Sequence, residues 1–191
     1  MIVLFNAPPK AGKSFSCNYL YSLSPEDSFI LPMASSIKFY ARCLYNIPHD
    51  METIEILEKY KDDKLEIFDG YSPREVYINL SESYFKKFHG EDYFAKMFVK
   101  KAKNLKVNNF KNIYVPDLGF QVELDTFVNE FGENEIILVQ LTSPNCSFEN
   151  DSRNYVFSDK VKTICLYNDK SKTSYFYQNL ENLYKEYVKK Q

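Results

Sequence analysis

Hydrophobic residues along the chain alternate between short continuous runs and longer stretches with a helical period. The continuous runs lie at residues 2–5, 28–31, 113–115, 135–141 and 161–166. Strands of a parallel sheet that is covered on both faces are apolar throughout, so runs of this kind predict buried parallel strands. We therefore expect a mostly parallel sheet of five strands.

Between these runs, apolar residues recur every three or four positions and predict helices. One helix is expected to begin at Lys13, a weaker one to span residues 50–60, and another to begin at Pro73, after a serine cap. The apolar stripes that we expect to face the core consist of Met33, Ile37, Ala41 and Leu44; Tyr77, Leu80, Tyr84 and Phe88; Phe94, Met97, Phe98, Ala102 and Leu105; Leu124, Phe127, Val128 and Phe131; and Tyr175, Phe176, Leu180, Leu183, Tyr184 and Tyr187.

Strands that alternate with helices are typical of an α/β fold with right-handed crossovers. A length of 191 residues and a hydrophobic content of 45% fit one domain over residues 1–191, with helices on both faces of the sheet. One polar segment, TSPNCSFENDSRNY, is long for a loop inside a compact domain. Because such loops commonly serve as lids or binding loops, we expect a lid at about residues 143–158.

Composition narrows the classes of partner. The net charge of −2 gives no global electrostatic reason to expect nucleic acid or an anionic membrane, so any bound anion must be held locally. No apolar run approaches the roughly 20 residues that a membrane helix needs. The four cysteines are scattered, without the spacing of a zinc site or a redox dithiol, and are expected to be buried free thiols.

The segment APPKAGKS, residues 7–14, has the length and the ending of the phosphate-binding pattern G-x-x-x-x-G-K-[ST]. Ala7 replaces the first glycine, and the two prolines after it lack N–H groups, but both lie outside the part whose amides would surround a phosphate. The alternative is a tight proline-rich turn with a solvated lysine. The residues expected to bind phosphate are Lys10, Ala11, Gly12, Lys13, Ser14 and Phe15.

Two further residues are placed for phosphate chemistry. Asp117 follows a predicted strand at the sheet edge where open α/β sheets bind ligands, and it could hold a magnesium-bound water; its other role would be to cap the next helix. Arg153 lies in the predicted lid and could neutralise a transferring phosphoryl group, or it could be a solvated loop arginine.

A second group of cations lies on predicted helices between residues 33 and 105. Arg74 stands at a helix start, and Lys38 and Arg42 lie one turn apart. Arginine suits phosphate because its guanidinium can donate two parallel hydrogen bonds. We expect these residues to hold an acceptor phosphate.

Several phrases together carry a family resemblance. They are the loop ending in Gly-Lys, Ser-Ser-Ile-Lys at 35–38, Ser-Pro-Arg-Glu-Val at 72–76, Gly-Glu-Asp-Tyr-Phe at 90–94, Val-Pro-Asp at 115–117 with Glu123, and Tyr-Asn-Asp at 167–169. In this order they resemble the deoxynucleoside monophosphate kinases of tailed bacteriophages, a branch of the P-loop nucleotide kinases. The resemblance implies a three-layer fold, transfer from ATP-Mg²⁺ to a deoxynucleoside monophosphate, and a place for Asp92 in the acceptor site.

The sequence also departs from that family. Gly119 stands where members commonly have an arginine two residues after the strand-end aspartate, Ser81 stands where a glycine is frequent, and Ser14 replaces an aspartate. Two alternatives therefore stay open. One is a P-loop kinase for another small acceptor, such as a sugar or a modified nucleotide. The other is a nucleotide-binding regulator that has lost transfer.

The resulting hypothesis assigns roles to these residues. Lys13 and the loop amides bind the ATP phosphates, Ser14 and Asp117 hold Mg²⁺, and Arg153 closes over the transferring group. The catalytic set is thus Lys13, Asp117 and Arg153, and the acceptor is held by the second group of cations with Asp92. We expect a cytoplasmic protein, in the host cytoplasm if a phage encodes it, and a homodimer is left open.

Overall fold

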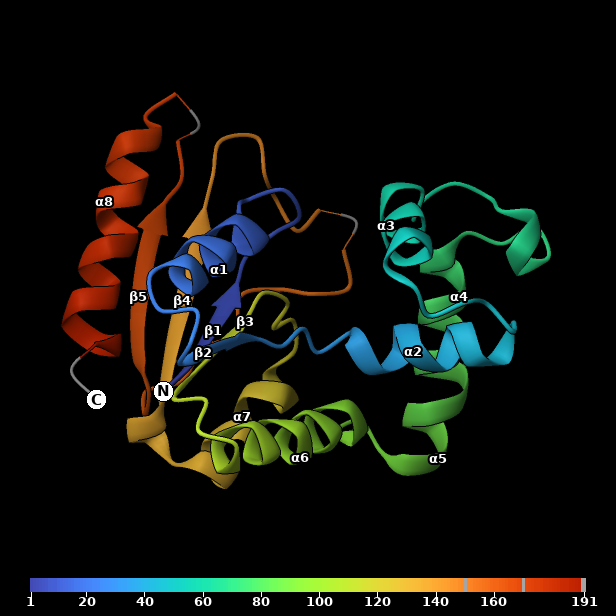
Figure 1. Ribbon diagram of the computed structural model, residues 1–191, viewed down its shortest axis with the longest axis horizontal. Coiled ribbons are helices and arrows are strands. Elements are labelled where there is room, and N and C mark those ends of the chain that lie inside the picture. The colour runs from blue at the N-terminus through green and yellow to red at the C-terminus, as the bar shows by residue number, and fades with distance from the viewer. Residues whose placement is uncertain (150, 170, 190–191) are drawn as a thin grey trace. The chain divides into compact units, whose positions relative to one another are not determined.

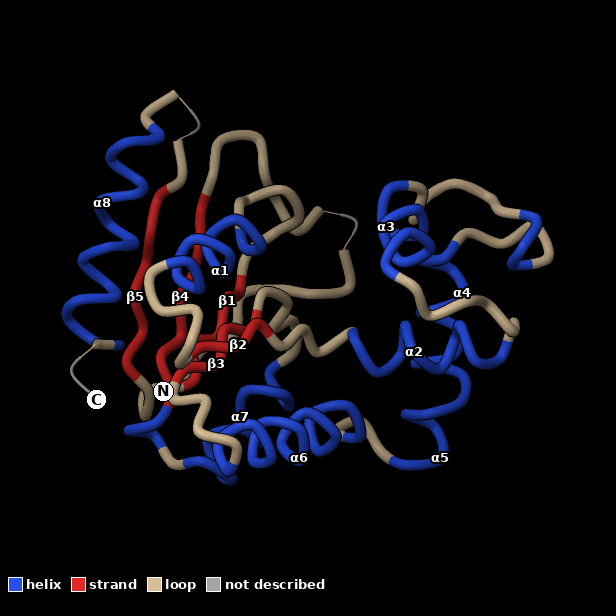
Figure 2. The backbone as a smooth tube through the Cα atoms, viewed as in Figure 1, coloured by secondary structure: helices blue, strands red, loops and turns tan. Residues whose placement is uncertain are grey.

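A parallel five-stranded sheet is the framework of the part of the chain that carries the loop of residues 7–14. The computed structural model describes residues 1–149, 151–169 and 171–189, which form two compact units: Met1–Met33 with Ala95–Gln191, and Ala34–Phe94. The strands run in the order β2-β3-β1-β4-β5 (Figure 2). Their bounds are Ile2–Asn6 for β1, Ser28–Ile30 for β2, Asn112–Val115 for β3, Ile136–Thr142 for β4 and Lys162–Tyr167 for β5.

The first strand occupies the centre of the sheet. Ile2 is paired with Ile113 of β3 on one side and with Ile136 of β4 on the other. Every residue of β1 is buried, as the continuous apolar run predicted. The chain leaves β1 toward β2 on one side, whereas β4 continues to β5 on the other, so the strand order reverses beside β1. The carboxyl ends at such a reversal are the usual ligand-binding edge of an open α/β sheet.

Helices cover both faces of this sheet (Figure 1). Residues Val3 and Phe5 point to the side where Leu20 of α1 and Phe176 of α8 complete the core. Alternate residues of the same strand lie in the core of the other face, with α6 and α7. The bounds are Lys13–Ser22 for α1, Tyr93–Val107 for α6, Gln121–Phe131 for α7 and Thr173–Leu183 for α8. The first unit is therefore a three-layer α/β structure, with short additions at Glu133–Glu135 (η3) and Tyr184–Val188 (η4).

The second unit is helical and has a core of its own. Its elements are α2 (Ser35–Leu44), α3 (Met51–Lys59), η1 (Glu66–Phe68), α4 (Pro73–Asn79), η2 (Leu80–Lys86) and α5 (Lys87–His89). Ala41, Ile47, Leu57, Phe68 and Val76 form the buried cluster. The predicted start at Ser72-Pro73 is confirmed, because the Ser72 hydroxyl accepts from the Glu75 amide while the Glu75 carboxylate accepts from the Ser72 amide.

Some residues predicted to face the core are exposed. Tyr84 and Phe88 are 53% and 67% exposed. They lie in and after η2, which has π-helical winding, so a stripe spaced for 3.6 residues per turn loses its phase there. The predictions for Leu44, the last residue of α2, and Tyr175, in the first turn of α8, are also wrong, since both side chains are largely exposed.

The expectation of buried thiols holds for one cysteine. All four are free, but only Cys17 is buried, whereas Cys146 is partly buried and Cys43 and Cys165 are exposed. Cys165 lies on β5, an edge strand of the sheet, where one face remains open to solvent. Within the described residues, no helix has the length and apolar character that crossing a membrane requires.

Candidate functional site

The loop of residues 7–14 joins the buried strand β1 to the start of α1. Gly12 adopts the left-handed conformation at φ 106°, and Lys10 also has a positive φ, of 64°. Gly12 is the N-cap of α1 and provides no side-chain cap. The first amides of a helix have no partner within the helix, so this end presents donors and the positive end of the helix dipole to the loop.

Two helices of the second unit begin with a side-chain cap. At α3, the Asp50 carboxylate accepts from the Thr53 amide at 2.8 Å, and at α4 Ser72 and Glu75 form a reciprocal cap. Only a ligand or water can satisfy amides that no side chain caps. The starts of α2 and α8 also have no side-chain cap, so what distinguishes α1 is the combination of an uncapped start with a left-handed Gly12 and with Lys13 at its first position.

Lys13 bends back over the loop. Its Nζ donates to the carbonyl oxygens of Ala7 at 2.5 Å and Pro8 at 2.8 Å. The pKa of Lys13 is lowered to about 8, mainly by burial and also by the Arg153 guanidinium, whereas Asp117 and Asp151 act in the opposite direction. Lys13 is thus a partly buried cation that shares its surroundings with a second cation and two carboxylates, which supports a local anion site.

A buried asparagine, Asn168, supports the loop from the end of β5. Its Nδ2 donates to the Ala11 carbonyl at 2.9 Å, and its own backbone is tied to Thr142 and to the Ser143 hydroxyl. A Cβ on Gly12 would lie 2.4 Å from Asn168 Nδ2. Gly12 is therefore required both by its left-handed backbone and by this close approach.

Asp117 lies between β3 and α7, as the sequence predicted. Its Oδ1 accepts from the Met33 amide at 2.8 Å, which joins the ends of β2 and β3. The amides that open α7, those of Gly119 and Phe120, donate instead to the Glu123 carboxylate at 2.9 and 3.0 Å. Glu123 thus performs the capping that was the alternative role for Asp117.

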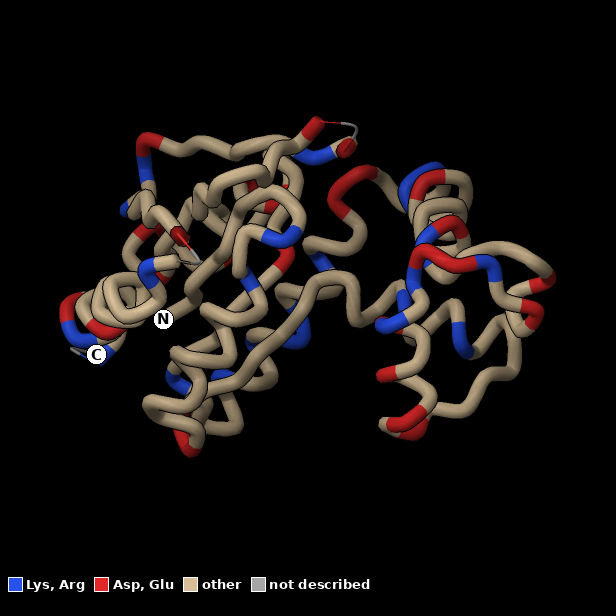
Figure 3. Tube along the Cα trace, turned by 90° about the horizontal axis from the view of Figure 1, so that it is seen from above, with Lys and Arg blue, Asp and Glu red and all other residues tan. Residues whose placement is uncertain are grey.

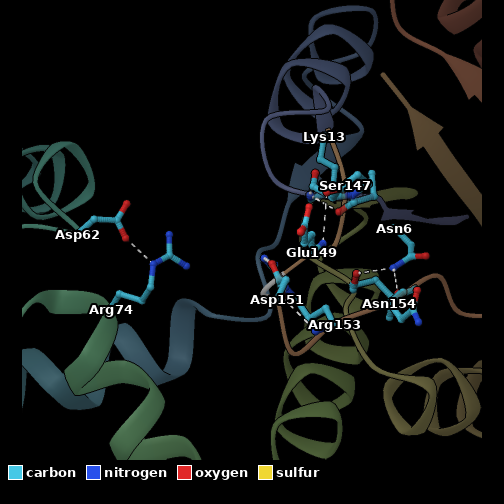
Figure 4. Close-up of polar contacts among 12 residues, drawn as sticks. Asn6, Lys13, Asp62, Arg74, Ser147, Glu149, Asp151, Arg153 and Asn154 are labelled. Carbon is cyan, nitrogen blue, oxygen red and sulfur yellow. Dashed lines mark hydrogen bonds and ion pairs between the residues drawn. The ribbon is translucent and has the colours of Figure 1, made fainter. Parts of the chain in front are cut away.

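Arg153 is held by a neighbouring carboxylate. Its Nε donates to Asp151 Oδ1 at 2.8 Å, and its Nη2 donates to Asp151 Oδ2 at 2.6 Å (Figure 4). The two side chains are 25% and 15% exposed. This two-bond contact raises the pKa of Arg153 and lowers that of Asp151. Arg153 is not a fully solvated loop arginine, which was the alternative.

The chain that follows Arg153 is tied to the end of β1. Asn6 is fully buried; its Nδ2 donates to the carbonyls of Leu118 and Asn154, both at 3.1 Å, and its Oδ1 accepts from the Val156 amide at 3.0 Å. Figure 4 shows Asn6 beside Asn154. One side chain therefore connects the β3–α7 turn with residues 154–156.

Two glutamines hold the same segment from other elements. Gln140 of β4 donates to the Val156 carbonyl at 2.7 Å. Gln121 of α7 donates to the Phe157 carbonyl at 2.9 Å and accepts from the Phe157 amide at 3.0 Å. The end of the predicted lid at residues 143–158 is thus bound to the sheet and to α7; residue 150, within that range, lies outside the described residues.

Ser14 and Asp117, the residues expected to hold magnesium, carry oxygen atoms of the kind that Mg²⁺ binds. Ser14 is exposed at the second position of α1, and Asp117 acts electrostatically on Lys13. Among the described residues, no group of three or more His, Cys, Asp and Glu could hold a metal ion. Mg²⁺ normally keeps several waters and uses one or two protein ligands together with phosphate oxygens, a mode that does not require such a group.

The predicted acceptor residues belong to the second unit. Lys38 Nζ pairs with the Glu58 carboxylate, Arg42 Nε donates to His49 Nδ1 at 3.2 Å, and Arg74 Nε contacts Asp62 Oδ1 at 2.5 Å. Within this unit α2, which carries Lys38 and Arg42, packs on α4, which carries Arg74. Asp92 is partly exposed just before α6. Figure 3 shows acidic and basic residues interspersed along both units.

Sequence reasoning missed Asn6, Asp151 and Asn168 as parts of the site. Asn6 had a signal, because it is a polar residue at the end of a buried apolar run. Asp151 had a weaker one, two residues from Arg153. No protein-family model matches the chain, and the search of curated proteins found no match. Any functional conclusion therefore depends on the site itself.

Proposed function

We propose that this chain is a P-loop kinase that transfers the γ-phosphoryl group of ATP to a nucleoside or deoxynucleoside monophosphate. The observation that carries the proposal is the loop of residues 7–14, with a left-handed Gly12 and an uncapped helix start, beside Lys13, Asp117 and Arg153. An uncapped helix start and two cations around one point favour a polyphosphate over a neutral ligand. The finer fold assignment, a P-loop kinase fold, is part of this proposal.

In the proposed reaction, an oxygen of the acceptor phosphate forms a bond to the γ-phosphorus, and the bond from that phosphorus to the β–γ bridging oxygen breaks. Bound ATP-Mg²⁺ supplies the phosphoryl group and neutralises part of its charge. Lys13 exchanges the carbonyls of Ala7 and Pro8 for phosphate oxygens, and the amides that begin α1 donate to the same phosphates. Ser14 and Asp117 orient the magnesium ion, and Arg153 neutralises charge on the transferring group.

The acceptor side of the proposal rests on Lys38, Arg42, Arg74 and Asp92 of the second unit. Lys38 and Arg74 are paired with Glu58 and Asp62, but exposed ion pairs are weak, so a phosphate dianion can replace either carboxylate. Arg42 donates to the neutral ring of His49 and keeps its charge for a phosphate.

One observation favours a second function. Asp151 neutralises Arg153 through two hydrogen bonds, and Gly119 takes the place of the arginine expected from the family resemblance. A protein with its arginine neutralised could bind a nucleotide without transferring phosphate. Binding of ATP with no turnover on any acceptor would select this function.

The test is ADP formation from ATP-Mg²⁺ over a full panel of ribo- and deoxynucleoside monophosphates, compared with Lys13→Ala. We expect activity on at least one acceptor and a loss on the order of 10³ in kcat/KM for Lys13→Ala. Lys111→Ala is the matched control, because Lys111 is an exposed lysine that precedes β3 at the other end of the sheet. A Lys13→Ala protein with the wild-type rate would contradict the proposal.

A further inference from the structure

A glycine lies where the side chain of Arg153 crosses the turn between β3 and α7. A Cβ placed on Gly119 would lie 2.6 Å from Cδ and 2.8 Å from Cγ of Arg153. Carbon atoms in contact are normally about 3.5–4.0 Å apart. The aliphatic part of Arg153 therefore lies directly on the Gly119 backbone, in space that any other residue would fill.

The backbone of Gly119 does not itself require glycine. Four other glycines, Gly12, Gly70, Gly90 and Gly132, have positive φ values, whereas Gly119 is not among the positive-φ residues. Alanine at this position would thus be compatible with the local backbone. The contact with Arg153 is the physical reason for a glycine here.

Neither side of this contact can move freely. On one side, the Gly119 amide donates to Glu123, and the preceding Leu118 carbonyl accepts from Asn6. On the other side, Asp151 holds the guanidinium at two atoms, and the Asn154 carbonyl accepts from Asn6. The close contact involves Cγ and Cδ, in the middle of the arginine side chain, so a rotation of its end alone would not relieve it.

We propose that Gly119 is a positioning residue, which sets where the guanidinium of Arg153 lies at the site formed by Lys13 and Asp117. This inference rests on the proposed function for its catalytic consequence. Arg153 is then already in place before the nucleotide binds, instead of being carried in by a closing lid. A phosphate oxygen can approach Nη1 without breaking the contact of Nε and Nη2 with Asp151.

The first test is a thermal-denaturation cycle of Gly119→Ala, Arg153→Ala and the double variant, which does not depend on activity. We expect Gly119→Ala to lower the melting temperature by about 3–8 °C in the wild-type background, as overpacking does. In the Arg153→Ala background, Gly119→Ala should change the melting temperature little, because alanine lacks the Cγ and Cδ atoms that would clash. Arg153→Lys keeps Cγ and Cδ, so Gly119→Ala should again destabilise that variant.

The second test is kinetic and separates positioning from general stability. We expect Gly119→Ala to lower kcat at least about 10-fold, with the KM for ATP changed by less than about two-fold, because a displaced arginine fails in the transition state. In the Arg153→Ala background, Gly119→Ala should cause no further loss of kcat.

Several results would overturn the inference. They are an unchanged melting temperature in Gly119→Ala, an equal fall of the melting temperature in the wild-type and Arg153→Ala backgrounds, or failure to fold in both backgrounds. Each result would show that the contact with Arg153 is not the reason for a glycine at position 119. Wild-type protein without turnover, combined with the expected denaturation cycle, would remove the proposed function and leave Gly119 as the residue that places Arg153.

Discussion

Two arginine–aspartate pairs in this protein have the same chemistry and different surroundings. Arg153 and Asp151 are joined at two atoms and are 25% and 15% exposed, whereas Arg74 and Asp62 are 48% and 63% exposed. The first pair lies on Gly119 and is followed by backbone that Asn6 holds; the second bridges α4 and the segment after α3 at the surface. Burial and backbone anchoring, and not the ion pair alone, therefore determine how firmly an arginine is held in one place.

The largest expected difference between the two pairs is catalytic. Arg153→Ala should lower kcat on the order of 10³-fold with a small change in the KM for ATP, since it removes charge stabilisation from the transferring group. Arg74→Ala should mainly raise the KM for the acceptor, by about 10-fold, because a phosphate contact made equally in the ground state affects binding. Initial rates with both substrates varied distinguish these patterns. Equal effects of Arg153→Ala and Arg74→Ala on kcat would contradict the assignment of different roles to the two arginines.

The second difference concerns stability. Asp151→Asn weakens a partly buried contact and leaves Arg153 with less compensation for its burial, so we expect a loss of about 2 kcal/mol in the free energy of unfolding. Asp62→Asn should change it by less than about 0.5 kcal/mol, as for most exposed pairs. Urea denaturation measures both. A larger loss of unfolding free energy in Asp62→Asn than in Asp151→Asn would show that the exposed pair contributes more to stability, contrary to this prediction.

The third expected effect is a modest change of stability with pH, which arises because Lys13 lies near the buried pair. Burial disfavours the charge of Lys13, and the nearby Arg153 guanidinium adds to this, so the pKa of Lys13 is lowered from 10.5 to about 8 in the folded protein. Between pH 8 and pH 10.5, Lys13 holds its proton in the unfolded chain but loses it in the folded protein, so the free energy of unfolding rises with pH. The destabilisation by the Lys13 charge is therefore fully present below pH 8 and is relieved as the pH rises toward 10.5.

Denaturation of the wild type and of Lys13→Met between pH 7 and pH 10 checks this sign. We expect the wild type to gain stability relative to Lys13→Met over this range, because only the wild type loses the buried charge. Lys13→Arg serves as control, since an arginine stays charged and should show no such gain. A constant difference between wild type and Lys13→Met would mean that Lys13 keeps its ordinary pKa.

Much of the fold of the first unit could be predicted because continuous apolar runs have few alternatives. The five runs became the strands of an all-parallel sheet, and the stripe with Leu124 and Phe127 faces the core. Prediction of buried residues failed where a helix departs from 3.6 residues per turn or where the residue lies at a helix end. Tyr84 and Phe88 are exposed because the helix changes to π-helical winding between Leu80 and Lys86.

The site was predictable where one short segment carries it. The pattern at residues 7–14 indicated the start of α1 at Lys13, because a loop between a buried strand and a helix is a local structure. The partners of that loop were not predictable. Asn168 is separated from Ala11 by 157 positions and Asn6 from Asn154 by 148, so no spacing in the sequence indicates these bonds.

The strands, the loop and the residues with chemistry that suits phosphate could thus all be recognised from local sequence patterns. Only the tertiary structure decided that Arg153 lies on Gly119, that Asp151 neutralises it and that Asn6 ties its segment to β1. The physical reason is the range of the interactions. Backbone propensity and apolar period act over a few residues, whereas the contacts that place Arg153 form only after parallel strands bring distant carboxyl ends to the same edge of the sheet.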